Sequence, residues 1–168
     1  NLMNDRLKTI VDLENYPIQN LDSSKIQAII KKCRSELDEF SCATIPNFIL
    51  PNSLKTMNME LERQIDKVFM SNKSINAYLN SKDDSALPLN HPKRIFMERD
   101  NGYLNPDLFH KDSEMKFLYE QEELLNFVSS CLGIKPIYRW ADPLACHAYN
   151  VMKPNGILPW HFDSCEFT

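Results

Sequence analysis

Residues 153–163, KPNGILPWHFD, are the basis of the fold that we expect for this chain of 168 residues. Its first four residues are typical of a turn, and apolar and aromatic residues that favour strands follow them. The segment before the turn, residues 144–152, is also β-prone, as is the short run 137–140. The pattern therefore predicts an antiparallel hairpin with arms at 144–152 and 157–163, which begins a larger sheet.

Two residues of the second arm carry the chemistry, His161 and Asp163. Neighbouring side chains of a strand alternate between its two faces, so this pair shares one face while Phe162 points to the other. An imidazole and a carboxylate on one face are two of the three ligands of a 2-His-1-carboxylate triad, which binds non-haem Fe(II). The spacing alone leaves a second interpretation open, in which the two residues form an ordinary hydrogen-bonded pair on a strand.

The first part of the chain is predicted to be mainly helical. Apolar residues recur there at helical spacing, and the runs Asp-Ser-Ser at 22–24 and Pro-Asn-Ser at 51–53 are typical helix starts. Gly133 suits the C′ position that ends the last of these helices. We therefore divide the chain into a mainly helical part, residues 1–135, and a sheet-forming part, residues 136–168. The expected elements before residue 136 are helices over 2–13, 24–40, 53–69 and 113–132, a polar loop over 71–92, a strand over 94–99 and a loop containing Asn101-Gly102.

Composition excludes several classes of function. Lys and Arg number 19 against 23 Asp and Glu, so the net charge of −4 offers no basic excess for binding nucleic acid. The 3 glycines form neither a P-loop nor a GxGxxG turn. No apolar run reaches the roughly 18 residues that span a membrane. The 5 cysteines are an odd number without a CxxC pair, which favours reduced thiols in a soluble, cytoplasmic protein.

The residues around the predicted hairpin resemble a known enzyme family. In their order and spacing they are similar to the Fe(II)/2-oxoglutarate-dependent oxygenases, and most similar to the branch of amino-acid hydroxylases and radical halogenases. The resemblance covers the chain from about residue 90 to its end, and the first 90 residues in general shape alone. The shared features are Asp142-Pro143-Leu144, Ala148-Tyr149-Asn150, Lys153-Pro154-Asn155-Gly156, Trp160-His161-Phe162-Asp163-Ser164 and Phe167-Thr168.

The resemblance implies an α+β fold in which N-terminal helices pack on a double-stranded β-helix (jelly roll), of which this chain holds the first strands. It implies that His161 and Asp163 are the first two iron ligands. The enzyme would use Fe(II), 2-oxoglutarate and O2, and it would release succinate and CO2. The halogenases carry Gly or Ala in place of the carboxylate, so Asp163 favours hydroxylation. The expected substrate is a free amino acid or a similar small polar metabolite, and an oligomer is compatible with the sequence.

The resemblance also suggests roles for further residues. Tyr149 and Asn150 are expected to contact 2-oxoglutarate, with a packed aromatic ring and a solvated amide as the competing interpretation. Trp160 is a candidate for lining the substrate pocket, with a packing role as the competing interpretation. Arg94, like Arg99, is a candidate partner for a substrate carboxylate, with a surface ion pair as the competing interpretation.

In these enzymes a second His ligand and an Arg that pairs with 2-oxoglutarate follow several strands later. We therefore expect a truncated chain that is inactive by itself. His147 is a weaker candidate for the third ligand, because alternation argues against both it and Asn150 facing the metal. Two other classes stay open. One is a non-catalytic helical interaction domain in which His161 and Asp163 form a structural pair. The other is a cupin-type mononuclear metal protein that uses no 2-oxoglutarate.

Overall fold

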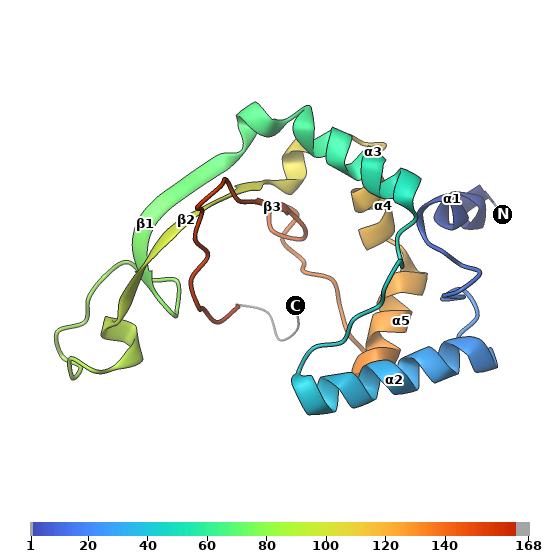
Figure 1. The fold of residues 1–168 in the computed structure, drawn as a ribbon, viewed down its shortest axis with the longest axis horizontal. Coiled ribbons are helices and arrows are strands. Elements are labelled where there is room, and N and C mark those ends of the chain that lie inside the picture. The colour runs from blue at the N-terminus through green and yellow to red at the C-terminus, as the bar shows by residue number, and fades with distance from the viewer. Residues whose placement is uncertain (1, 164–168) are drawn as a thin grey trace. The chain divides into compact units, whose positions relative to one another are not determined.

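The computed structural model describes residues 2–163, which divide into two compact units. The first unit joins the chain up to Arg63 with Pro106–His147, and the second joins Gln64–Asn105 with the chain from Ala148 onward. The described residues form five α-helices and a three-stranded antiparallel sheet (Figure 1). The chain is therefore a mixed α and β protein, which agrees with the α+β prediction, and residues 2–163 show no jelly roll.

The first unit contains all the α-helices of the described chain. The Ser23 side chain accepts a hydrogen bond from the backbone N–H of Ile26 at the start of α2, as the sequence predicts. Gly133, at φ 71°, ends α5, which confirms its predicted position. Helix α2 packs on α5 and α3 on α4, while α1 contacts both α3 and α4. The helices are α1 (Leu2–Ile10), α2 (Ser24–Phe40), α3 (Pro51–Glu62), α4 (Glu114–Tyr119) and α5 (Glu122–Leu132).

Aromatic packing holds the centre of this unit. Phe127 on α5 is 1% exposed, and its ring stacks on that of Phe48, with ring centroids 6.1 Å apart. Phe48 in turn meets the ring of Tyr16 edge-on. The apolar stripe of α1 is buried as well, through Leu7 and Ile10. Removal of this apolar surface from water is the main force that holds the helices together.

Two thiols lie next to one another in the same core, Cys33 on α2 and Cys131 on α5. Both residues are buried. Burial raises the pKa of Cys131 to about 12, and the adjacent Cys33 adds to the effect. The thiolate is the reactive form of cysteine, so at neutral pH Cys131 is an unreactive thiol.

We expect Cys42, which is exposed, to be alkylated at least ~100-fold faster than Cys131 in the folded protein, because the buried thiol does not ionise. Iodoacetamide labelling at mildly alkaline pH, followed by peptide mass spectrometry, measures both rates. Labelling in denaturant is the control, and there the two rates should become similar. Equal rates in the folded protein would contradict the burial of Cys131.

The second unit is a sheet with the strand order β1-β2-β3 (Figure 1). Strands β1 (Phe69–Asn76) and β2 (Phe96–Leu104) pair along their length. The short β3 (Tyr149–Val151) pairs with the other edge of β2. The segment that contains His161 and Asp163, called the HxD pair below, belongs to this unit. Short 3-10 turns precede β1 at Ile65–Lys67, precede β2 at Pro92–Arg94 and follow β2 at Pro106–Leu108.

Several predicted element boundaries are wrong. The helix expected to reach residue 69 ends at Glu62. Strand β1 begins at Phe69, the expected last residue of that helix, and continues through residues expected to form a polar loop. The strand expected at 94–99 continues to Leu104, through Asn101 and Gly102. Contact with β1 explains the glycine, because a Cβ there would lie 3.0 Å from the Phe69 carbonyl oxygen. Pairing between distant segments thus overrides the local turn signal of Asn-Gly.

The predicted hairpin is also wrong. Residues 137–140 and 144–148 contain no regular strand, and β3 is three residues long. The turn itself is present, with Asn155 in the left-handed region at φ 65°. However, β3 and the residues after the turn do not form a ladder with one another.

Instead, both arms pair with the same edge of β2, one after the other. Val151 lies opposite Gly102, and Ile157 forms an isolated bridge with Asp100, two residues earlier on β2. The residues between the two arms therefore loop out. A glycine at position 156 permits this close return, because a Cβ on Gly156 would lie 2.8 Å from the Asp100 carbonyl oxygen.

Candidate metal site

His161 and Asp163 lie in the segment 158–163, which follows the bridge at Ile157 and is not a regular strand. The two side chains nevertheless lie together, as their spacing predicts. Nε2 of His161 is 3.2 Å from Oδ1 of Asp163. The His161 side chain is 23% exposed and that of Asp163 is 43% exposed, so both are accessible from solvent.

A second contact orients the His161 ring. Its Nδ1 is 2.7 Å from the carbonyl oxygen of Pro159. A carbonyl oxygen only accepts hydrogen bonds, so Nδ1 carries a proton and donates it. In the tautomer with the proton on Nδ1, Nε2 carries the lone pair and faces the Asp163 carboxylate. Metal-binding histidines are oriented in this way by their other ring nitrogen, so the pair fits two positions of a metal site.

A third ligand is not found in the part of the chain that the structure describes. There, no group of three His, Cys, Asp or Glu side chains is arranged to hold a metal ion. His147, considered above as a third ligand, belongs to the first unit, whereas the HxD pair belongs to the second. Its ring packs against those of Phe109 and Tyr119, with centroids 4.7 and 5.2 Å away. Burial lowers the pKa of His147, which favours a neutral, packed side chain.

Strand β3 places Tyr149 and Asn150 on opposite faces of the sheet. Oδ1 of Asn150 accepts a hydrogen bond of 3.0 Å from Nδ2 of Asn101, which is 1% exposed. Oδ1 of Asn101 accepts in turn from Nε of Arg99, at 2.6 Å. Asn150 is therefore part of a row of polar side chains that crosses from β2 to β3. Asn101 was missed because Asn-Gly was interpreted as a turn, although its i, i+2 spacing from Arg99 is the signal of a shared strand face.

The guanidinium of Arg94 forms hydrogen bonds with residues of the loop before β2. Its Nε and Nη2 donate to the carboxylate of Asp83 at 2.8 and 2.7 Å, and its Nη1 donates to the carbonyl of Leu87 at 2.8 Å. The hydrogen bonds from Arg94 lower the pKa of Asp83. This is the ion pair named above as the competing interpretation for Arg94. A substrate carboxylate would have to displace Asp83 from it. Trp160 is 88% exposed. The substrate-binding roles of Arg94 and Trp160 stay predictions.

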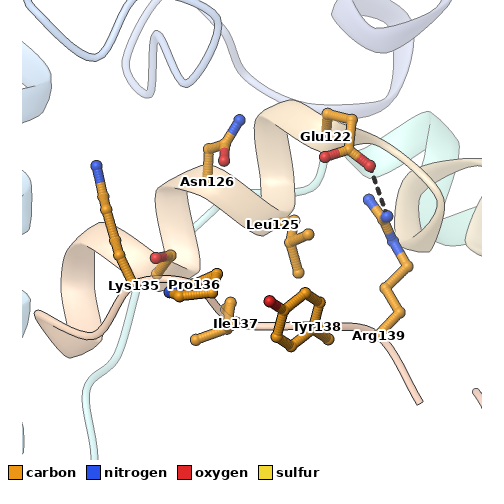
Figure 2. Close-up of a pocket in the computed structure, with 9 residues that line it drawn as sticks. Glu122, Leu125, Asn126, Lys135, Pro136, Ile137, Tyr138 and Arg139 are labelled. Carbon is orange, nitrogen blue, oxygen red and sulfur yellow. Dashed lines mark hydrogen bonds and ion pairs between the residues drawn. The ribbon is translucent and has the colours of Figure 1, made fainter. Parts of the chain in front are cut away.

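A groove of about 440 Å³ lies in the first unit, between α5 and residues 135–139 (Figure 2). Figure 2 shows Leu125 facing the side chains of this segment, with Arg139 and Glu122 at one end. Nη1 of Arg139 donates to Glu122 at 2.7 Å, and Nε donates to the carbonyl of Tyr119 at 2.8 Å. This ion pair engages the guanidinium, and we assign no function to the groove.

Comparison with protein-family models, with curated proteins and with solved structures finds no match to this chain. No helix in residues 2–163 combines the length and the apolar character needed to cross a membrane. Three residues of the resemblance, Ser164, Phe167 and Thr168, lie outside the described residues. The described residues that bear on function are therefore the HxD pair and the polar row of Arg99, Asn101 and Asn150.

Proposed function

We propose that His161 and Asp163 are two iron ligands of an Fe(II)/2-oxoglutarate-dependent dioxygenase. The orientation of His161 carries this proposal: the hydrogen bond to Pro159 leaves Nε2 as the coordinating nitrogen, 3.2 Å from the Asp163 carboxylate. One imidazole nitrogen and one carboxylate oxygen belong to the donor set of non-haem Fe(II) oxygenases. The resemblance of the surrounding residues to that family supports the same function.

The proposed reaction is the hydroxylation of a free amino acid or a similar small polar metabolite. When bound, the iron supplies the redox chemistry, in which one atom of O2 enters the substrate and the other enters succinate as 2-oxoglutarate loses CO2. Asp163 provides the carboxylate that the halogenases lack, which favours hydroxylation. Pro159 keeps the His161 ring in the tautomer that can coordinate.

The polar row on β2 and β3 is suited to hold a carboxylate of the amino acid or of 2-oxoglutarate. Arg99 donates through Nε to Asn101, and this contact leaves its two Nη groups for a bidentate contact. The amide nitrogen of Asn150 can add a further donor, because its Oδ1 is the atom bound to Asn101. Asn101 fixes both neighbours and is itself fully buried.

A structural role of the pair is the alternative, in a protein domain without catalysis. The direct 3.2 Å contact between Nε2 and Oδ1 favours it, because a protonated Nε2 would form an ion pair with Asp163 without any metal. The two functions differ in one property. Iron competes for both side chains in the dioxygenase, and it has no affinity for them in the structural pair.

The test uses the product of the whole gene, purified and freed of metal under anaerobic conditions. Fe(II) and 2-oxoglutarate are added, O2 is admitted, and mass spectrometry measures succinate while the common amino acids are offered in turn. We expect iron-dependent release of succinate, in equal amount to a hydroxylated product of one amino acid. Failure to bind iron, with no succinate formed from any mixture, would contradict the proposed function and favour the structural pair.

A further inference from the structure

The segment that carries the HxD pair is held from one side by a turn at the end of β1. No strand ladder fixes residues 158–163. Instead, the Phe162 N–H donates to the carbonyl oxygen of Ala77 at 2.8 Å. The ring of Phe162 also lies beside that of Tyr78, with centroids 5.2 Å apart and ring planes at 40°. The backbone and the ring of Phe162 are thus both bound by adjacent residues of the turn.

This turn, residues 76–80, is tightly determined by one buried amide. The Asn76 side chain accepts hydrogen bonds from the backbone N–H groups of Tyr78 and Asn80, at 3.0 and 3.2 Å. Its Nδ2 donates to the carbonyl oxygen of Lys93 at 2.7 Å. Leu79 adopts φ 60°, a left-handed conformation that is rare for leucine and persists where the surroundings impose it. The turn is therefore a rigid support.

The position of Phe162 determines where its two neighbours point. In an extended segment, the side chains on either side of a residue project to the opposite face. Holding Phe162 against Tyr78 therefore turns His161 and Asp163 away from the turn and toward one another, to the observed 3.2 Å. Nζ of Lys93 lies 5.5 Å from the centroid of the Tyr78 ring, which adds a cation–π contact to that ring.

We propose that Tyr78 is a positioning residue for the metal site, which acts through Phe162 to hold His161 and Asp163 in the geometry that binds the ion. The inference rests on the proposed function, because it takes the HxD pair as a metal site. Residues that orient metal ligands without touching the metal change metal affinity by about 10–100-fold when they are replaced. Tyr78 contacts Phe162 rather than the ligands themselves, so we expect an effect at the lower end of this range, although the residue lies more than 80 positions before the ligands in the sequence.

The experiment is a Co(II) titration of the whole gene product, followed by the visible absorption of the bound ion, without 2-oxoglutarate. Tyr78→Ala removes the ring, and we expect Co(II) affinity to fall about tenfold. Tyr78→Phe keeps the ring and should bind Co(II) with wild-type affinity. Leu89→Ala is the matched control, since Leu89 is an apolar residue of the same β1–β2 connection and is 81% exposed. It should bind Co(II) as the wild type does.

Thermal melting separates a positioning role from a general loss of stability. A general loss of stability would lower the melting temperature of Tyr78→Ala and leave its Co(II) affinity unchanged, whereas a positioning role lowers the Co(II) affinity. Wild-type affinity in Tyr78→Ala, together with loss of binding in His161→Ala, would overturn the positioning role and leave the proposed function standing. Absence of a His161-dependent Co(II) site in the wild type would overturn both. If Tyr78→Ala does not fold, Tyr78→Leu, which keeps an apolar contact without the ring, is judged by the same criteria.

Discussion

Asp163→Ala is expected to abolish iron retention by the whole gene product, and 2-oxoglutarate-dependent hydroxylation with it. The carboxylate lies 3.2 Å from Nε2 of His161, the nitrogen that we propose coordinates iron, so its removal leaves one donor where two converge. Loss of a residue that merely orients a ligand costs about 10–100-fold in metal affinity, and loss of the ligand itself should cost at least ~100-fold. Iron content per protein after desalting, and succinate release, measure the two effects.

The matched control is Asp66→Ala, which removes an exposed carboxylate from the same unit of the fold. It should retain iron and turnover. His161→Ala should behave as Asp163→Ala does, because each variant removes one of the two converging donors. Unchanged iron content in Asp163→Ala, with the fold intact by circular dichroism, would refute the assignment of this residue as a ligand.

Phe127→Ala should lower the free energy of unfolding by about 3–5 kcal/mol, the largest stability effect that we expect from a single substitution here. The ring is 1% exposed and stacks on Phe48 in the core of the helical unit, so its removal leaves a cavity and also removes the aromatic contact. Urea denaturation followed by circular dichroism in the helix region measures the change.

Val128→Ala is the control for that experiment, since Val128 is the next residue on α5 and is 38% exposed. The variant keeps the helix and removes two methyl groups from a partly exposed side chain, so its free energy of unfolding should stay within about 1 kcal/mol of the wild type. A cost below about 1 kcal/mol for Phe127→Ala as well would mean that the core does not depend on this ring.

The helical part of the fold was largely predictable because its signals are local. The Ser23 cap and the Gly133 stop act within a few residues of where they occur, and both are confirmed. The HxD pair was predictable for the same reason: two side chains two residues apart in an extended segment lie on one face whatever the rest of the chain does. The observed contact between His161 and Asp163 agrees, even though the segment is not a regular strand.

The sheet was poorly predictable because its strands depend on partners far away in the chain. Strand β1 is too polar to be recognised by itself, and it forms because β2 pairs with it along its length. The Asn-Gly pair at 101–102, a turn signal by local rules, lies inside β2 between two neighbouring strands. The predicted hairpin failed in the same way, because β2 offers both arms a better partner than each offers the other.

Local sequence was enough for the presence of most helices, for the Ser23 start of α2 and the Gly133 end of α5, and for the pairing of His161 with Asp163, since each depends on interactions within one turn of helix or two residues of extended chain. Tertiary structure alone decided what surrounds that pair. It brought Tyr78 against Phe162, linked Asn150 to Asn101 and Arg99, and bound Arg94 to Asp83. The contacts of Tyr78 with Phe162 and of Asn101 with Asn150 join segments far apart in the chain, and no local pattern encodes them, because they arise from strand pairing and loop closure.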